Sequence, residues 1–162
     1  MRAIVMSDTH GMRDSLFYLM EAAWTLAPGR IDAYIHCGDG YGDFEQLQDF
    51  LRAHDPAAEL HFVRGNCDWT NSDDMPAEKV LHLGGADVFV CHGHHYRVKN
   101  DLMLVDEAAA ARGCSVTLFG HTHQPIIDTR RTLLVNPGSA QDSRLAVLDI
   151  VNGRPNARLL RL

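Results

Sequence analysis

The sequence of 162 residues contains no long hydrophobic run. A helix that spans a bilayer needs about 20 consecutive apolar residues, and no segment of this chain approaches that length. The apolar run in the opening MRAIVM is also too short for the hydrophobic part of a signal peptide. We therefore expect a protein without a membrane segment, located in the cytoplasm.

Excess positive charge and closely spaced cysteines are also missing. The chain has 15 Lys and Arg residues against 21 Asp and Glu residues, a formal net charge of −6, and no local basic cluster. General nucleic-acid binding is therefore not expected. The cysteines, Cys37, Cys67, Cys91 and Cys114, are more than twenty residues apart, which excludes a CxxC motif and predicts reduced thiols.

The composition that remains is that of an ordinary globular protein, with 46% hydrophobic and 22% charged residues. A chain of this length can bury about 70% of its unfolded surface in one core. Because it has no internal repeats or long linkers, we predict a single domain over residues 1–162. The sequence leaves the oligomeric state open and is compatible with a homo-oligomer.

The pattern of apolar residues predicts an α/β fold. Strands are predicted at 2–6, 32–37 and 60–63 and helices at 15–26 and 44–53, a βαβαβ order that implies a buried parallel sheet. The second half is mainly β, with strands at 79–83, 87–91, 116–119, 126–129, 132–135, 145–151 and 157–160 and a helix at 102–112. Hairpin turns are predicted at residues 84–86 and 152–153. We expect two mixed sheets that pack together under flanking helices.

Polar residues of metal-binding type follow most of these strands. They are Asp8 and His10, then Asp39, Asn66 and His92, and finally His121 and His123. Ligands of open α/β sheets gather beyond the carboxyl ends of the strands, which is where these residues fall. In extended backbone, residues i and i+2 project to the same side, so each closely spaced pair is expected to face one pocket.

Seven oxygen and nitrogen ligands are too many for one tetrahedral metal that keeps a position open for substrate, so they favour two metal ions. In such a site a carboxylate such as Asp39 bridges ions about 3.5–4 Å apart, and a water between them is acidified to a hydroxide that attacks phosphorus. Carboxylate, imidazole and amide ligands without a thiolate suit manganese, iron, cobalt, nickel or zinc. We expect two divalent ions, with manganese favoured, and a small phosphate-ester substrate.

The ordered motifs DxH, GD, GNxD, HGH and GHTH resemble those of the calcineurin-like metallophosphoesterase superfamily. GNCD at 65–68 and NPGS at 136–139 resemble its YfcE-like phosphodiesterase branch. The resemblance implies a four-layer αββα sandwich and a binuclear-metal phosphoesterase that prefers diesters to monoesters. It assigns Asp8, His10 and His123 to the first metal, Asn66, His92 and His121 to the second, and Asp39 to both.

Two positions depart from the superfamily pattern. Many members have GNHD as the third motif, and its His, with an Asp three residues after the bridging carboxylate, is taken to protonate the leaving oxygen. Here those positions are Cys67 and Gly42. A thiol with an ordinary pKa of about 8.5 is a poor general acid near neutral pH. We hypothesise that leaving groups depart with help from the metals alone or from His94.

The remaining candidates have supporting roles. Asp39, Asn66 and His94 form the predicted catalytic set, and Asn66, His94 and Arg64 form the substrate-binding set, because a guanidinium matches phosphate oxygens. The alternatives are a structural Arg64 and a solvent-facing His94. Asp43 and Asp68 are candidates for orienting ligands, and the NPGS segment for supporting the site. Substrate selection is expected from loops at 69–76 and 95–101.

Two other functions stay open. The retromer complex uses a subunit of the implied fold as an interaction scaffold with little or no catalysis, but a scaffold is expected to have lost ligands, and here all seven are present. A metal-storage role is suggested by ten histidines, which however form no tract.

Overall fold

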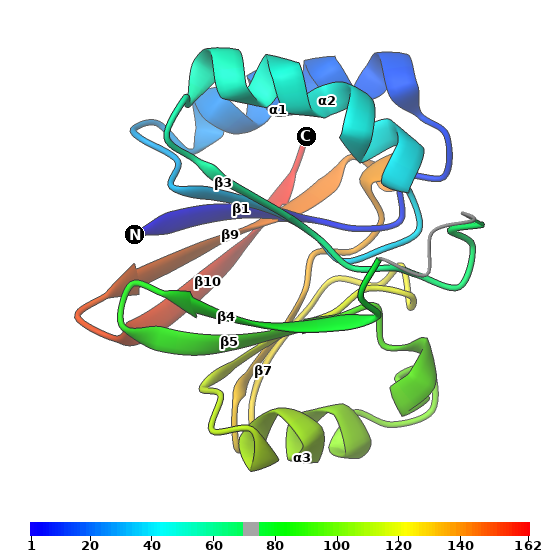
Figure 1. Cartoon of the computed structure of the whole chain (residues 1–162), viewed down its shortest axis with the longest axis vertical. Coiled ribbons are helices and arrows are strands. Elements are labelled where there is room, and N and C mark those ends of the chain that lie inside the picture. Colours follow the sequence, from blue (N-terminus) through cyan, green and yellow to red (C-terminus); the bar gives the residue numbers. More distant parts are fainter. Residues whose placement is uncertain (70–74) are drawn as a thin grey trace.

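The computed structural model describes residues 1–69 and 75–162, apart from the side chains of residues 13 and 14. Its strands form two five-stranded sheets, shown in Figure 1. The first sheet has the strand order β10-β9-β1-β2-β3. Its members are β1 (Arg2–Met6), β2 (Ala33–His36), β3 (Glu59–Phe62), β9 (Arg144–Val151) and β10 (Arg154–Arg161). Strands β1, β2 and β3 are parallel, and β9 pairs antiparallel with β1 and β10.

The second sheet has the strand order β4-β5-β6-β8-β7. Its members are β4 (Glu78–Leu83), β5 (Ala86–Cys91), β6 (Val116–Leu118), β7 (Ile126–Thr129) and β8 (Leu133–Asn136). The three central strands are parallel, and the edge strands β4 and β7 are antiparallel to their neighbours. Both sheets are mixed, which confirms the sequence prediction.

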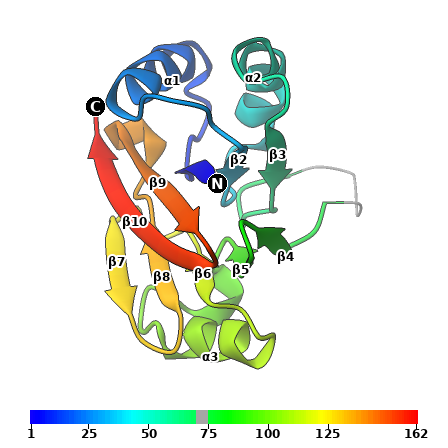
Figure 2. The same ribbon diagram turned by 90° about the vertical axis from the view of Figure 1, so that its left-hand side faces the viewer.

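Helices cover the two outer faces of the paired sheets. They are α1 (Arg13–Leu26), α2 (Tyr41–His54) and α3 (Met103–Ala111), with short 3₁₀ helices η1 (His94–Tyr96) and η2 (Ala140–Asp142). Helices α1 and α2 lie over the first sheet and α3 lies under the second, as Figures 1 and 2 show. The result is the four-layer αββα sandwich that the resemblance implies. No helix in the two described ranges is long and apolar enough to cross a membrane.

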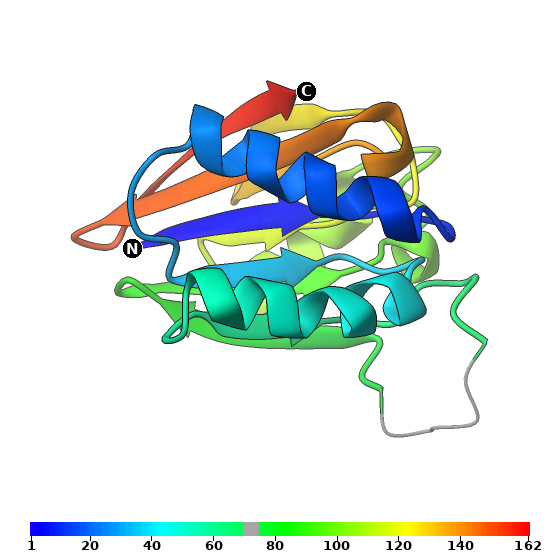
Figure 3. The ribbon, with the colours of Figure 1, turned by 90° about the horizontal axis from the view of Figure 1, so that it is seen from above.

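Strand β1 shows how the sequence creates these layers. Ile4 and Met6 are fully buried in the cluster between the first sheet and its helices, and Ala3 and Val5 are fully buried in the cluster between the sheets. Successive side chains of a strand point to opposite faces, so a strand buried on both faces is continuously apolar. In Figure 3, which is seen from above, α1 and α2 lie in front of this sheet.

Both predicted hairpins are confirmed. The two-residue turns Gly84-Gly85 and Asn152-Gly153 have positive φ throughout, the conformation that connects twisted antiparallel strands most tightly. The last strand is longer than expected and begins at Arg154, directly after its turn, rather than at Ala157. Cross-strand pairing with the apolar β9 therefore extends to polar positions that show no strand pattern of their own.

The loops after the parallel strands meet at one edge of the sandwich and are joined across the two sheets. The Asp8 backbone N–H donates to the Gly38 carbonyl at 3.0 Å, which links the loops after β1 and β2. The Gly120 N–H donates to the His92 carbonyl at 3.1 Å, which links the loops after β5 and β6. The His121 N–H then donates to Asp8 Oδ2 at 3.1 Å and connects one sheet to the other.

Candidate metal centre

The first predicted ligand group comes from the loops after β1 and β6. Asp8 Oδ1 lies 3.3 Å from His123 Nε2 and 3.8 Å from His10 Nε2, and the two imidazole nitrogens are 3.3 Å apart. Donor atoms bound to one ion at about 2.0–2.2 Å are about 3–4 Å from one another. The three side chains therefore have the spacing of donors around one cation.

A second group lies directly beside the first. Asp39, His92 and His121 offer donor atoms that all lie within 4.8 Å of one another. Asp39 Oδ2 is 3.2 Å from His92 Nε2, and Asn66 Oδ1 is also 3.2 Å from that nitrogen. His92 Nδ1 donates to the Cys37 carbonyl at 2.8 Å, which directs Nε2 toward the centre.

Asp39 connects the two groups. Its Oδ2 atom lies 3.2 Å from His92 Nε2 in the second group and 4.0 Å from His10 Nε2 in the first. The structure thus brings all seven predicted ligands into one centre, with one carboxylate between two sets of donors.

One of the two reasons given for this convergence, the i and i+2 spacing of extended backbone, is wrong. Five of the seven residues are in the left-handed region with positive φ and none of these five is extended; they are Asp8, His10, Asp39, His121 and His123. A non-glycine residue in this region costs of order 1–3 kcal/mol, and such residues concentrate at functional sites where surrounding structure holds them. Each side chain turns into the centre because the backbone bends sharply there.

Two glycines make room for the buried carboxylates. A Cβ atom at Gly65 would lie 2.1 Å from Asp39 Oδ1, and one at Gly120 would lie 1.9 Å from Ser7 Oγ and 2.9 Å from Asp8 Oδ2. The neighbours are short, buried side chains that cannot move away. The glycines of the GNxD and GHTH motifs are therefore required by close packing against the site.

Asp68 organises the site through the backbone. Its carboxylate accepts hydrogen bonds of 2.8–2.9 Å from the N–H groups of Asp39, Gly40, Tyr41 and Gly65. The N–H groups of Gly40 and Tyr41 lie at the N-terminus of helix α2, and Asp68 satisfies both. The helix therefore begins at Tyr41 and not at residue 44 as predicted. Asp68 was a candidate for orienting ligands, but its role as a helix cap was not predicted. It lies 27 residues after Tyr41, so the sequence around the start of α2 contains no capping pattern.

We expect Asp68→Ala to lower the free energy of unfolding by about 2–4 kcal/mol, because four backbone donors lose a charged acceptor. Urea denaturation monitored by circular dichroism measures this loss. Asp49→Ala, at an exposed position of the same helix, is the matched control. A change below about 0.5 kcal/mol for Asp68→Ala would show that the carboxylate does not hold the loops.

Other orienting residues act through single contacts. Asp43 Oδ2 accepts from the Gly11 N–H at 2.7 Å, next to His10. In the NPGS segment, Asn136 Nδ2 donates to the Gly120 carbonyl at 2.9 Å, and Ser139 Oγ donates to the Asp8 carbonyl at 2.8 Å. These contacts fix the backbone on both sides of the first group.

Burial and neighbouring charges shift the pKa values of Asp39 and of three histidines at the centre in different directions. Burial alone would raise the pKa of Asp39, but its hydrogen bond and charge interaction with His92 outweigh this and hold the pKa well below its usual range. Burial lowers the pKa of His92, and the interaction with Asp39 more than reverses the effect. Burial and neighbouring histidines lower the pKa of His94 and of His121 to about 4. At neutral pH the last two imidazoles are therefore neutral, the form in which a nitrogen binds a metal.

His94 and Arg64 lie beside the second group. The His94 ring centroid is 5.4 Å from that of His92 and 6.0 Å from that of His121. Arg64 is close enough for its charge to contribute to the lowered pKa of His94. Of the two loops expected to select the substrate, the loop at 95–101 begins within η1. Residues 70–74 of the loop at 69–76 lie outside the described residues.

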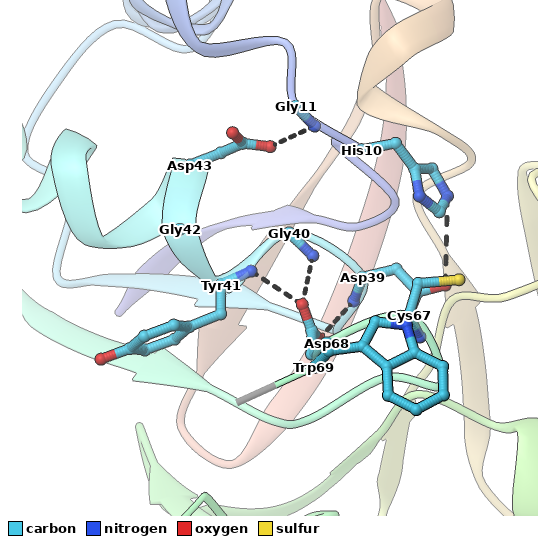
Figure 4. A pocket seen from close by; sticks show the side chains of 10 residues that line it. All are labelled: His10, Gly11, Asp39, Gly40, Tyr41, Gly42, Asp43, Cys67, Asp68 and Trp69. Atoms are coloured by element: carbon cyan, nitrogen blue, oxygen red, sulfur yellow. Dashed lines mark hydrogen bonds and ion pairs between the residues drawn. The ribbon is translucent and has the colours of Figure 1, made fainter. Parts of the chain in front are cut away.

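Figure 4 shows a pocket of about 540 Å³ that opens beside the first group. It is lined by His10, Gly11, Asp39, Gly40, Tyr41, Gly42, Asp43, Cys67, Asp68 and Trp69. The two positions that depart from the superfamily pattern, Gly42 and Cys67, are both in its wall. Limited burial and the charge of Asp39 raise the pKa of Cys67, so the free thiol is an even weaker acid than expected.

The residues present fit a divalent cation. Asp8 Oδ1 is completely buried and has no hydrogen-bond partner among the described residues, while three imidazole Nε2 atoms lie within 4.0 Å of it. A buried carboxylate oxygen without a donor is costly unless a cation satisfies it.

The fold and these donors define a metal-binding α/β sandwich with its site at the edge where loops from both sheets meet. Residues 1–152 match the calcineurin-like phosphoesterase superfamily domain, and the chain belongs to this superfamily. The probable metallophosphoesterase YsnB of Bacillus subtilis is 30% identical over 98% of this chain and 89% of its own length. The superfamily implies divalent metal ions and hydrolysis of phosphate esters.

Solved structures agree with this placement. A Streptococcus pneumoniae protein described as a predicted phosphoesterase has a TM-score of 0.72 and 26% identity, covering 99% of this chain and 88% of that one. Vps29 of Entamoeba histolytica, complexed with Zn²⁺, has a TM-score of 0.71 and 19% identity, covering 99% and 98%. At that identity, the Vps29 likeness shows a shared fold.

Proposed function

We propose that the protein is a binuclear-metal phosphoesterase that prefers phosphodiesters. The observation that supports two ions is the position of Asp39, whose carboxylate faces donors of both groups. The preference for diesters is inferred from the GNCD and NPGS motifs, which resemble the phosphodiesterase branch. For the seven oxygen and nitrogen ligands by themselves, manganese is the proposed ion, with nickel, cobalt, iron and zinc as the other candidates.

In this proposal the seven residues divide as the superfamily resemblance implies. Asp8, His10 and His123 would hold the first ion, Asn66, His92 and His121 would hold the second, and Asp39 would contact both. Bound divalent ions supply Lewis-acid polarisation of the phosphoryl group and lower the pKa of water. Hydrogen bonds orient these donors before an ion binds. His92 donates to a buried backbone carbonyl, and the carboxylates of Asp8 and Asp39 each accept from a backbone N–H group.

Three residues are proposed to act on the substrate itself. Arg64 and Asn66 contact phosphoryl oxygens, for which a guanidinium and an amide N–H are suitable donors. His94 lies beside the second group, and its buried Nδ1 has no hydrogen-bond partner among the described residues. It is neutral at pH 7 in the free protein, and a bound phosphate anion would raise its pKa and let it carry a proton to the leaving oxygen.

The proposed activity is tested with metal-stripped protein and single additions of Mn²⁺, Ni²⁺, Co²⁺, Fe²⁺ or Zn²⁺. Hydrolysis of bis-p-nitrophenyl phosphate is compared with that of p-nitrophenyl phosphate, and His121→Ala serves as the inactive control. Diester hydrolysis that returns with metal and is lost in the variant supports the proposal. Faster monoester hydrolysis would overturn the diester preference alone.

His94→Ala is expected to steepen the dependence of rate on the pKa of the leaving group. We expect a loss of at least about 10²-fold for alkyl esters and less than about fivefold for nitrophenyl esters, whose leaving groups need no proton. A series of aryl and alkyl phosphodiesters measures the slope. His82→Ala, at an exposed position of β4, is the control, and an unchanged slope in His94→Ala would remove His94 from the role.

The alternative is a non-catalytic interaction scaffold of the same fold, and the fold shared with Vps29 is compatible with it. A scaffold does not need a complete centre, whereas all seven donors are present and close together here. Folded protein that hydrolyses neither substrate with any of the five metals would favour the scaffold.

A further inference from the structure

A sulfur atom lies at the edge of the centre, on the side of the first group. The donor atoms of His10, Asp39 and Cys67 all lie within 4.8 Å of one another, and the thiol is exposed in the wall of the pocket in Figure 4. The ligand set expected from the sequence contains no sulfur, and Cys67 stands at the general-acid position of the superfamily pattern. The three-dimensional position is therefore new information.

The turn that carries the sulfur is held firmly. The Cys67 backbone N–H donates to Asp39 Oδ1 at 2.7 Å, and Asn66 Nδ2 contacts the sulfur at 3.1 Å. Asp68 fixes the same turn by accepting from the Gly65 N–H at 2.8 Å. The sulfur is thus positioned by the same contacts that position the carboxylate between the two groups.

A second observation indicates a cation on this side of the centre. Asp8 Oδ1, fully buried and without a hydrogen-bond partner among the described residues, is 3.8 Å from His10 Nε2. His10 is therefore close to both an unsatisfied carboxylate oxygen and the Cys67 sulfur. A cation bound by His10 could accept electron density from both.

We propose that Cys67 Sγ is an additional, thiolate ligand of the ion bound by His10 and that it shifts the metal preference of the centre toward zinc, cobalt or iron and away from manganese. This inference rests on the proposed metal centre. On binding, the S–H bond breaks, a metal–sulfur bond forms, and the proton passes to solvent without any oxidation or reduction. Soft thiolate ligands favour zinc and iron over manganese, which prefers oxygen.

The test uses cobalt as a spectroscopic probe. Metal-stripped full-length protein is titrated with Co²⁺, and absorption is recorded for wild type, Cys67→Ser and Cys114→Ser. We expect a near-ultraviolet sulfur-to-cobalt charge-transfer band in wild type and in Cys114→Ser, whose substituted thiol is buried away from the site, and no such band in Cys67→Ser. The visible cobalt bands should remain in all three proteins, because the imidazole and carboxylate donors are unchanged.

Metal affinity and thiol reactivity give independent measurements. Competition with a chromophoric chelator should show that Cys67→Ser loses at least about tenfold in Zn²⁺ affinity and less than about threefold in Mn²⁺ affinity. Of the four cysteines, all within the described ranges, Cys67 is the exposed one, so Ellman's reagent reports mainly on it. Saturating Zn²⁺ should slow its modification at least about tenfold.

The outcomes separate this inference from the proposed function. Visible cobalt bands without a charge-transfer band, and a zinc affinity that is the same in wild type and Cys67→Ser, would overturn the thiolate ligand and leave the metal centre intact. Failure of folded wild-type protein to bind Co²⁺ or Zn²⁺ at all would overturn both.

Discussion

Asp39→Asn is expected to reduce metal-dependent phosphodiester hydrolysis at least about 10³-fold while leaving the fold intact. The carboxylate is almost completely buried, and one of its oxygens faces donors of both groups, at 3.2 Å and 4.0 Å. An amide of the same shape keeps the carbonyl oxygen that accepts from the Cys67 N–H, so the turn is preserved. It removes the negative charge on which both proposed ions depend.

The measurement is kcat/KM for bis-p-nitrophenyl phosphate at saturating metal, together with the metal content of the purified protein. Asp87→Asn is the matched control, because this aspartate is half exposed and paired with His82 on the β4-β5 hairpin. We expect the control to keep full activity and Asp39→Asn to lose bound metal. Wild-type activity in Asp39→Asn would exclude the carboxylate as a shared ligand.

The second large effect is a gain. Gly42→Asp combined with Cys67→His is expected to accelerate hydrolysis of alkyl phosphodiesters by about 10²-fold, because a general acid with a pKa near 7 typically contributes that much. Both positions are in the wall of the same pocket, and a Cβ atom at Gly42 meets no described atom within 4 Å. The new carboxylate would lie in the first turn of α2, where the helix dipole favours a negative charge.

Rates for nitrophenyl and alkyl diesters distinguish this gain from a change in metal binding. Gly42→Asn with Cys67→His is the control for the carboxylate, and Cys67→Ser is the control for the lost thiol. We expect the gain for alkyl esters alone and mainly in the complete pair. An equal effect on both ester classes would mean that protonation of the leaving group does not limit the rate.

Much of the centre could be predicted because its residues follow buried strands. The apolar runs fix strands such as β1, and the carboxyl ends of parallel strands necessarily meet at one edge, so Asp8, Asp39 and His92 were expected to converge. The detailed geometry could not be predicted in the same way. Asp8 and His10 face one site because both adopt positive φ, and this conformation depends on contacts from distant loops rather than on their spacing.

Roles that depend on backbone contacts or on nearness in space could not be predicted from the sequence, even for residues that were candidates. Asp68 caps a helix that begins 27 residues earlier in the chain, so no local N-cap pattern announced the true start of α2. The sulfur of Cys67 approaches His10 only because the loops after β1 and β3 meet. Both effects arise from packing between segments far apart in sequence.

The position of β9 between β10 and β1 determines when this site can form during synthesis. One edge of β1 pairs with β2, which follows within about 30 residues, but the other edge pairs with Arg144–Val151. Until β9 has been synthesised, that edge of the strand that precedes Asp8 lacks its partner, and His121 and His123 come only about 20 residues before β9 in the chain. The centre therefore forms late in folding, after the strand that begins at Arg144 has paired with β1.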